Sequence, residues 1–205
     1  MGNRAVITTE NNWKNDGAGI YLHWNGGRDS VEAFLKYCEL KGYRSPSNDC
    51  YGFARLCQVI GNFFGGNASI GIDTLWHLDC DNWDNGVYII DGWKIVDRKY
   101  FNGVEQNGHD LQEMLLSIDK AMPKNEQIKD FLEAEKVDIV AEGDTIVFID
   151  WNGEVKKAKV VGHGENEWVN GKNVKGIPYI DMYGEIPEKN INNYLIYKNW
   201  RKVVK

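Results

Sequence analysis

Side chains able to bind or react gather at one short turn near the N-terminus. An apolar segment runs through a Gly-Gly pair directly into an amphipathic helix pattern, and polar and aromatic residues crowd around that pair. Backbone N–H groups are free where a helix starts, so the turn predicts a binding site for a small anionic ligand such as a nucleotide. Its members would be Tyr21, Trp24, Asn25, Gly26, Gly27 and Arg28.

Each member of this turn has a defined role in the hypothesis. The Arg28 guanidinium would form paired hydrogen bonds to a phosphate or carboxylate, and Trp24 or Tyr21 would stack on a flat group. Neither a Walker A motif nor the three-glycine dinucleotide motif is present. The competing interpretation is a tight strand–helix turn with Arg28 on the surface.

A second candidate is Cys50, which stands in the first turn of a predicted helix, where the helix dipole favours a thiolate. Residues 48–54 resemble the nucleophile segment of papain-like cell-wall amidases and their circularly permuted relatives, although Tyr51 replaces a small residue. The resemblance implies that Cys50 is a nucleophile and that His23 or His77 is its base. The competing interpretation is a packed thiol in an apolar helix.

A third candidate is the run from His77 to Asp81. If this run were a strand, His77, Asp79 and Asp81 would point to one face and could hold a divalent cation. The spacing fails as a calcium loop, because Ile90 occupies the position where an EF-hand needs glutamate. We interpret the run as turn-forming residues, and we expect neither a metal site nor a cofactor.

Composition limits the function classes. The net charge is −6, and the basic residues form no large cluster, which disfavours direct binding of nucleic acid. No apolar run is long enough to cross a membrane, and no signal-peptide pattern is present, so we expect a cytoplasmic protein. The four cysteines form no CxxC pair and are expected to be reduced. The eight tryptophans either form a recognition surface or cover sheet edges.

Helix and strand signals are mixed in the first two thirds of the chain. Asp29 and Glu32 predict a capping box for a helix that ends at Gly42, and Asn48 or Asp49 predicts the cap of a second helix that ends at Gly65. Hairpin turns are predicted at 85–86 and 91–92, a third helix after Asp110 and a short helix after Pro123. The predicted buried faces are Val31, Phe34, Leu35 and Cys38; Ala54, Cys57, Ile60 and Phe64; and Leu111, Met114, Leu115 and Ile118.

The pattern changes near residue 135. Short strand-like runs at 137–140, 145–149, 155–161, 177–182 and 191–197 are separated by turn signals such as those at 150–153 and 170–171. The sequence therefore predicts an α+β protein with two domains. Residues 1–133 would form a mixed helix and antiparallel-sheet domain, and residues 134–205 a small SH3-like β-barrel.

Two segments, residues 19–27 and 49–57, resemble a set of uncharacterised proteins from phages and mobile elements of gut Firmicutes. The resemblance implies a compact accessory protein that acts against host antiviral defence by binding a host effector protein or a signalling nucleotide. The leading hypothesis is a non-catalytic inhibitor, and the alternative is the papain-like hydrolase. The Cys50→Ser substitution separates the two, because only catalysis needs the thiol.

Overall fold

The computed structural model describes residues 2–203 except 14–15, 48, 67–68, 102, 104, 106, 137–140, 142, 151–152, 164–166, 170–171, 175–177 and 182–199, and in the strands between 161 and 181 it describes the backbone alone. The chain divides into two compact units. The N-terminal unit comprises Met1–Glu39 and Tyr43–Gln127, and the C-terminal unit comprises Leu40–Gly42 and Ile128–Lys205. The combination of helices with mixed and antiparallel sheets confirms the α+β class.

The N-terminal unit is built on a five-stranded sheet with the strand order β3-β2-β1-β4-β5. The strands are β1 (Ala5–Thr9), β2 (Ala18–Leu22), β3 (Ile70–Thr74), β4 (Val87–Asp91) and β5 (Lys94–Lys99). β1 pairs with β4 in parallel, whereas the other neighbours are antiparallel. The prediction of an antiparallel sheet was therefore wrong. Between β1 and β4 the chain forms α1, β2, α2, α3 and β3, and this long connection lets it re-enter the sheet in the same direction.

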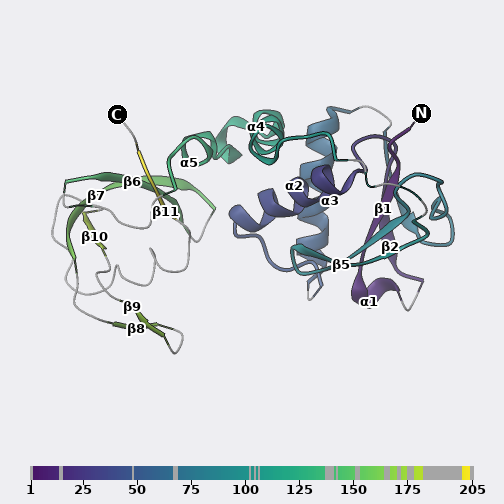
Figure 1. Ribbon diagram of the computed structural model, residues 1–205, viewed down its shortest axis with the longest axis horizontal. Coiled ribbons are helices and arrows are strands. Elements are labelled where there is room, and N and C mark those ends of the chain that lie inside the picture. The colour runs from purple at the N-terminus through teal and green to yellow at the C-terminus, as the bar shows by residue number, and fades with distance from the viewer. Residues whose placement is uncertain are drawn as a thin grey trace. The chain divides into compact units, whose positions relative to one another are not determined.

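The helices of this unit are α1 (Glu10–Trp13), α2 (Arg28–Leu40), α3 (Cys50–Phe64) and α4 (Leu111–Ala121), and a 3₁₀ turn follows at Lys124–Glu126. Figure 1 shows α2 and α3 together on one side of the sheet and α1 at the end of β1. The predicted cap of α3 is confirmed, since Asp49 accepts a hydrogen bond from the Tyr51 N–H, and α3 ends at Gly65 with φ +63°. Asp110 caps α4 as predicted.

Three details of the helix predictions were wrong, and one of them is Leu111, which was predicted on a buried face of α4 but is exposed. Asp29 lies inside α2 rather than before it, and its carboxylate accepts hydrogen bonds from the N–H groups of Gly108 and His109. The buried face of α3 is Gly52, Leu56, Val59 and Ile60, whereas Ala54 is exposed. A Cβ at position 52 would lie 2.3 Å from the carbonyl oxygen of Arg44, so Gly52 must face the preceding loop, and this contact sets the rotation of α3.

The strand register divides the sheet into two faces. Ile7 stands beside Ile20 and Tyr88 on one face, and all three side chains are completely buried. On the other face, Val6, Val87 and Ile89 form a small apolar cluster that packs against residues of α1 and of the segment 75–86. We call this second surface the loop face. β1 is buried on both faces, which explains why apolar residues stand at three consecutive positions, 5–7, before two buried threonines.

Residues 75–86 form turns and bends, neither a strand nor one arm of a hairpin. The predicted hairpin at 85–86 was therefore wrong, because Gly86 leads from this irregular segment into β4. The hairpin predicted at 91–92 is confirmed, since Asp91 pairs with Lys94 and Gly92 has φ +57°.

The C-terminal unit contains a short helix and two antiparallel sheets. Helix α5 (Lys129–Leu132) precedes a four-stranded sheet with the order β10-β7-β6-β11, formed by Pro178–Asp181, Val155–His163, Thr145–Ile149 and Trp200–Lys202. A two-stranded ribbon joins β8 (Glu167–Val169) to β9 (Lys172–Val174). The strands that the structure describes form no closed barrel. The runs predicted at 137–140 and 191–197 lie outside the described residues.

Gly86 lies where the segment 75–86 enters the sheet, and its substitution tests this packing. It has φ +68°, and a Cβ there would lie 2.2 Å from the carbonyl oxygen of Lys99. We expect Gly86→Ala to lower the free energy of unfolding by about 2 kcal/mol or more, measured by urea denaturation. Gly108→Ala is the control, since a Cβ there meets nothing within 4 Å. Equal losses in the two variants would contradict the assignment.

Candidate functional site

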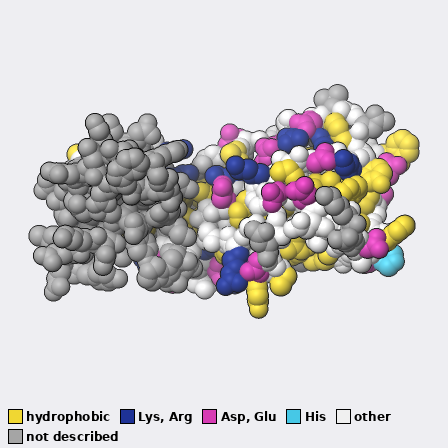
Figure 2. Space-filling view, turned by 90° about the horizontal axis from the view of Figure 1, so that it is seen from below, with side chains coloured by type: hydrophobic (Ala, Val, Ile, Leu, Met, Phe, Trp, Pro, Cys, Tyr) yellow, Lys and Arg dark blue, Asp and Glu magenta, His cyan; other side chains and the backbone are white. Residues whose placement is uncertain are grey.

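The loop face carries a platform of partly buried side chains above its apolar cluster. Leu75, Leu78 and Cys80 come from the segment 75–86, while Trp13 ends α1 and Tyr21 belongs to β2. Three parts of the chain, α1, β2 and the segment 75–86, therefore meet on this face. Figure 2, seen from below the view of Figure 1, shows hydrophobic side chains reaching the surface of this unit between acidic and basic ones.

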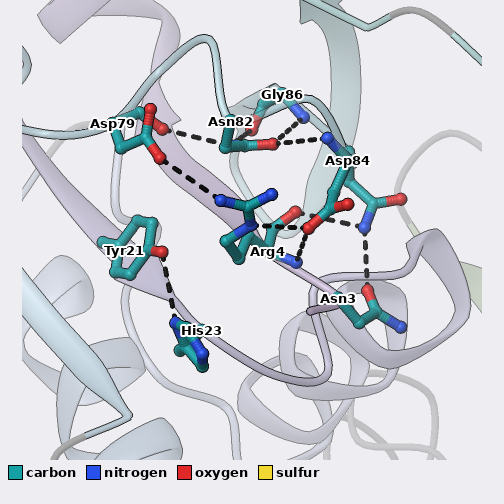
Figure 3. A network of polar contacts seen from close by, with 9 residues as sticks. Asn3, Arg4, Tyr21, His23, Asp79, Asn82, Asp84 and Gly86 are labelled. Atoms are coloured by element: carbon teal, nitrogen blue, oxygen red, sulfur yellow. Dashed lines mark hydrogen bonds and ion pairs between the residues drawn. The ribbon is translucent and has the colours of Figure 1, made fainter. Parts of the chain in front are cut away.

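Arg4 fastens the segment 75–86 to the start of β1 (Figure 3). Its Nε donates to the Asp84 carboxylate at 2.7 Å, its backbone N–H donates to the same oxygen at 3.1 Å, and its Nη1 lies 3.8 Å from the Asp79 carboxylate. Burial raises the pKa of the Asp84 carboxyl, but the two bonds from Arg4 outweigh this effect and hold the pKa below its ordinary value. The guanidinium thus lies beside Asp79, one of the carboxylates that the sequence offered to a metal.

The Asn82 side chain forms hydrogen bonds with the backbone of the same segment, 75–86. Its side-chain amide donates to the carbonyl oxygens of Asp79 and Gly86, and its side-chain oxygen accepts from the N–H groups of Asp84 and Gly86. Figure 3 shows this amide at the centre of the loop. The side chain is completely buried, so these four hydrogen bonds are shielded from water. The result is a rigid turn that presents Trp83 at its tip.

Two aromatic residues of this face are held in an unfavourable backbone conformation. Trp83 has φ +60° and Tyr100 has φ +54°, and their side chains are 80% and 55% exposed. Bulky residues adopt this region at a cost of about 1 kcal/mol each. In the part of the chain that the structure describes, Trp83 makes no hydrogen bond or ring contact that would offset this cost. Trp76, at 78%, is almost as exposed.

Two hollows lie side by side on this surface and share Trp13. The first has a volume of about 260 Å³ and is lined by Trp13, Asp16, Leu75, Trp76, Cys80 and Tyr100. The second has a volume of about 400 Å³ and is lined by Glu10, Trp13, Ile89, Val96, Asp97 and Lys99. Both are open and partly aromatic, which is the lining that recognition sites commonly have. Sequence reasoning counted these aromatic residues but did not predict that they would meet.

The predicted Gly-Gly site exists as a turn, but the Gly26 N–H and the Arg28 guanidinium are already engaged. The Gly26 N–H donates to the Asn3 carbonyl oxygen at 2.8 Å, and a Cβ at Gly26 would lie 2.6 Å from that oxygen. Arg28 donates to Glu105 at 2.7 Å and to Glu32 at 3.3 Å. The bond to Glu105 raises the pKa of Arg28, and Arg28 in turn lowers the pKa of Glu105. An anion arriving here would have to displace Glu105.

The remaining members of that turn are brought together at its rim. The Tyr21 hydroxyl lies 3.4 Å from Nδ1 of His23, whose ring packs edge-on against Trp24 at 5.0 Å between centroids. Asn25 has φ +54°, and its amide nitrogen lies 3.5 Å from Nε2 of His109. No sequence signal linked His109 to this turn.

In the described part of the chain, Cys50 makes no hydrogen bond with His23 or His77. Cys50 is exposed at the start of α3, and Ser47 in the loop before it accepts a hydrogen bond from the Gly92 N–H, beyond the C-terminal end of β4. His23 lies near the opposite end of the parallel strands β1 and β4, where its carbonyl oxygen accepts a hydrogen bond from the Asn3 N–H before β1. Among the described residues, no hydrogen bond joins Cys50 to a histidine.

His77, Asp79 and Asp81 lie in a turn region rather than on one strand. His77 follows β3, and its Nδ1 lies 3.2 Å from the Asp73 carboxylate, while Asp79 faces Arg4. Asp81 is exposed. Within the described ranges, no group of three or more potential ligands is placed to hold a metal ion.

Comparison with protein-family models, with curated proteins and with solved structures finds no match to this chain. Among the described residues, no helix has both the length and the apolar character needed to cross a membrane. Function must therefore be argued from the chemistry of the surface itself.

The contact between Arg4 and Asp84 predicts a pH dependence of stability. Because the pKa of Asp84 is lowered on folding, the contact stabilises the fold fully above the unfolded value of about 3.9, and this stabilisation is lost as the pH falls through the folded value. We expect Asp84→Asn to be destabilised most at pH 7 and progressively less below about pH 4. Urea denaturation between pH 7 and the acid limit of folding measures this difference.

Asp81→Asn provides the matched control for this experiment. Asp81 is exposed on the same segment and forms no ion pair or hydrogen bond within the described part of the chain. Its substitution should leave the free energy of unfolding within about 0.5 kcal/mol of the unaltered protein at pH 7. If Asp84→Asn behaved in the same way, the contact with Arg4 would not hold the segment.

Proposed function

We propose that this chain is a non-catalytic binding protein that recognises a protein partner through the loop face of its N-terminal unit. The observation that carries the proposal is Trp83, which stands in a strained turn with 80% of its side chain exposed and makes no hydrogen bond or ring contact with the described part of its own chain. Strain persists where the surrounding structure enforces it, and such positions cluster at ligand contacts. Exposed tryptophan is also the residue type that contributes most to protein interfaces.

Charge favours a protein partner over a signalling nucleotide. Asp73, Asp79 and Asp81 are exposed beside the two protruding tryptophans, and the net charge of the whole chain is −6. Phosphate groups would be repelled by such a surface, whereas a basic patch would be attracted. At the predicted Gly-Gly site, Arg28 is already bound by two carboxylates, which weakens the case for a nucleotide there.

The biological setting is a further part of the proposal. The resemblance of residues 19–27 and 49–57 to proteins of phages and mobile elements supports an accessory protein that inhibits a host antiviral defence component in the bacterial cytoplasm. The C-terminal unit, for which we keep the SH3-like fold as a hypothesis, would support the binding unit or add contacts of its own. An inhibitor of this kind acts by occupying a surface and needs neither a nucleophile nor a cofactor.

The alternative is a papain-like cysteine hydrolase with Cys50 as its nucleophile. Its support is the exposed position of Cys50 in the first turn of a helix of fifteen residues. Its weakness is the absence of a histidine bonded to Cys50 among the described residues. Catalysis would require a rearrangement that brings a base within hydrogen-bonding distance of the thiol.

The two functions are separated by phage plating on bacteria that carry an active antiviral defence system and express this chain. We expect the unaltered chain to raise plating efficiency, Trp83→Ala to remove at least about tenfold of that gain, and Cys50→Ser to keep it. Leu111→Ala is the control, because Leu111 is an exposed apolar residue of α4 rather than of the loop face.

Two other outcomes of the plating experiment would contradict the proposal. If Trp83→Ala kept the full gain in plating efficiency and Cys50→Ser lost it, the binding function would be wrong and the hydrolase would be supported. No gain in plating with the unaltered chain would overturn the role against host defence.

A further inference from the structure

We propose that the hollow between Trp13, Trp76 and Tyr100 is an aromatic cage that takes the alkylammonium group of a lysine, free or methylated, on the partner protein. The inference rests on the proposed function, because it names the chemical group that the loop face would recognise. It can be tested on this chain alone, without the partner protein.

The walls of the cage are aromatic rings. Trp13 and Tyr100 meet edge to face, with 6.1 Å between centroids and 61° between planes, and Trp76 lines the same hollow. Aromatic faces carry partial negative charge, so a cation placed over several rings is attracted to all of them. Surrounding a cation with rings is the arrangement by which proteins recognise quaternary ammonium groups and methylated lysines.

The charge around the rings has the sign that a cation needs. Among the described residues that line the hollow, Asp16 is the charged one, and its carboxylate accepts a hydrogen bond from the Trp76 indole N–H. This bond both orients the indole and keeps a negative charge beside it. Glu10 and Asp97 line the neighbouring hollow, where Asp97 pairs with Lys99. A phosphate or carboxylate ligand would meet repulsion at Asp16.

The floor of the cage is apolar and uncharged. Leu75 and Cys80 pack on the cluster of Val6, Val87 and Ile89, and burial raises the pKa of the Cys80 thiol, with a smaller effect from Asp79. The thiol therefore remains protonated at neutral pH and offers no thiolate to a metal ion. An apolar floor beneath aromatic walls suits the methylene or methyl groups next to an ammonium nitrogen better than a hydrated metal ion.

The cage is held open by the fold rather than formed by flexible side chains. Tyr100 and Asp16 both adopt positive φ, at +54° and +48°. The backbone of Tyr100 lies close to Gly86: a Cβ added to Gly86 would be 2.7 Å from the carbonyl carbon of Tyr100. Side chains positioned in this way lose little entropy on binding, which favours affinity for a small group.

The size of the hollow matches one chemical group rather than a whole cofactor. Its volume of about 260 Å³ is below the range of roughly 300–1,000 Å³ that sites for drug-sized ligands occupy. A side-chain end fits this space, and the rest of a partner would lie across the exposed rim that Trp76 forms. The predicted ligand is therefore a group carried by a larger molecule.

The test uses choline as a probe and 3,3-dimethylbutan-1-ol, its uncharged isostere, as the matched control ligand. Binding is followed on the full chain by NMR of the tryptophan indole N–H signals, with the Trp76 signal assigned from Trp76→Phe. We expect choline to shift the Trp76 signal with a dissociation constant at least about tenfold lower than that of the neutral alcohol. Equal shifts with both ligands, or none with either, would overturn the cage.

Substitutions locate the site. Trp76→Ala should weaken choline binding by about tenfold or more, and Asp16→Asn by about threefold. Trp83→Ala is the matched control, because its side chain is as exposed as that of Trp76 but does not line the hollow. A loss of choline binding in Trp83→Ala equal to that in Trp76→Ala would contradict the assignment.

The result is also independent of the proposed role against host defence. Choline binding that depends on Trp76, found together with unchanged phage plating, would support the cage and overturn the inhibitor. Plating that depends on Trp83, found without selective choline binding, would support the inhibitor and overturn the cage.

Discussion

The ion pair between Arg4 and Asp84 is the contact on which the loop face depends. It joins the residue before β1 to a segment about eighty positions away, and Asn82 completes the attachment by bonding both ends of the turn. Only one face of the sheet is covered by α2 and α3, so the apolar side chains of Val6, Val87 and Ile89 need another cover. The segment 75–86 supplies it. The charged contact holds this segment together with two backbone hydrogen bonds, from the Asn85 N–H to the Arg4 carbonyl oxygen and from the Val6 N–H to the Gly86 carbonyl oxygen.

This arrangement explains why the exposed aromatic residues are displayed rather than buried. The segment covers the sheet with its smaller apolar residues, Leu75, Leu78 and Cys80, and turns Trp76 and Trp83 toward solvent. Covering the cluster with tryptophan instead would have buried more apolar area. Selection for stability alone does not account for this choice, whereas recognition of a partner does. The acidic residues between the tryptophans then decide which partners are attracted.

The residues of the polar turn at Gly26 and Gly27 are explained by contacts within the fold. Gly26 is required because the turn passes against the backbone of residues 3–5, and Arg28 is required because it pairs with Glu105. Arg98 donates to the same Glu105 oxygen and lies between the rings of Tyr88 and Phe101. Two arginines around one carboxylate fasten the segment that follows β5. The cluster of functional-looking residues at this turn therefore serves the packing of the unit as well as its surface.

The sequence alone predicted the features that depend on neighbouring residues: the α+β class, the Asp49 and Asp110 caps, the αL stop at Gly65 and the hairpin at Asp91 and Gly92. These succeed because capping and turn formation are decided within a few positions. The parallel pairing of β1 with β4, the rotation of α3 and the course of residues 75–86 required the tertiary structure. Each depends on a contact between distant segments, such as Gly52 against Arg44 or Arg4 against Asp84. The same holds for the cage, because Trp13, Trp76 and Tyr100 lie far apart in sequence and share no spacing that a pattern could reveal.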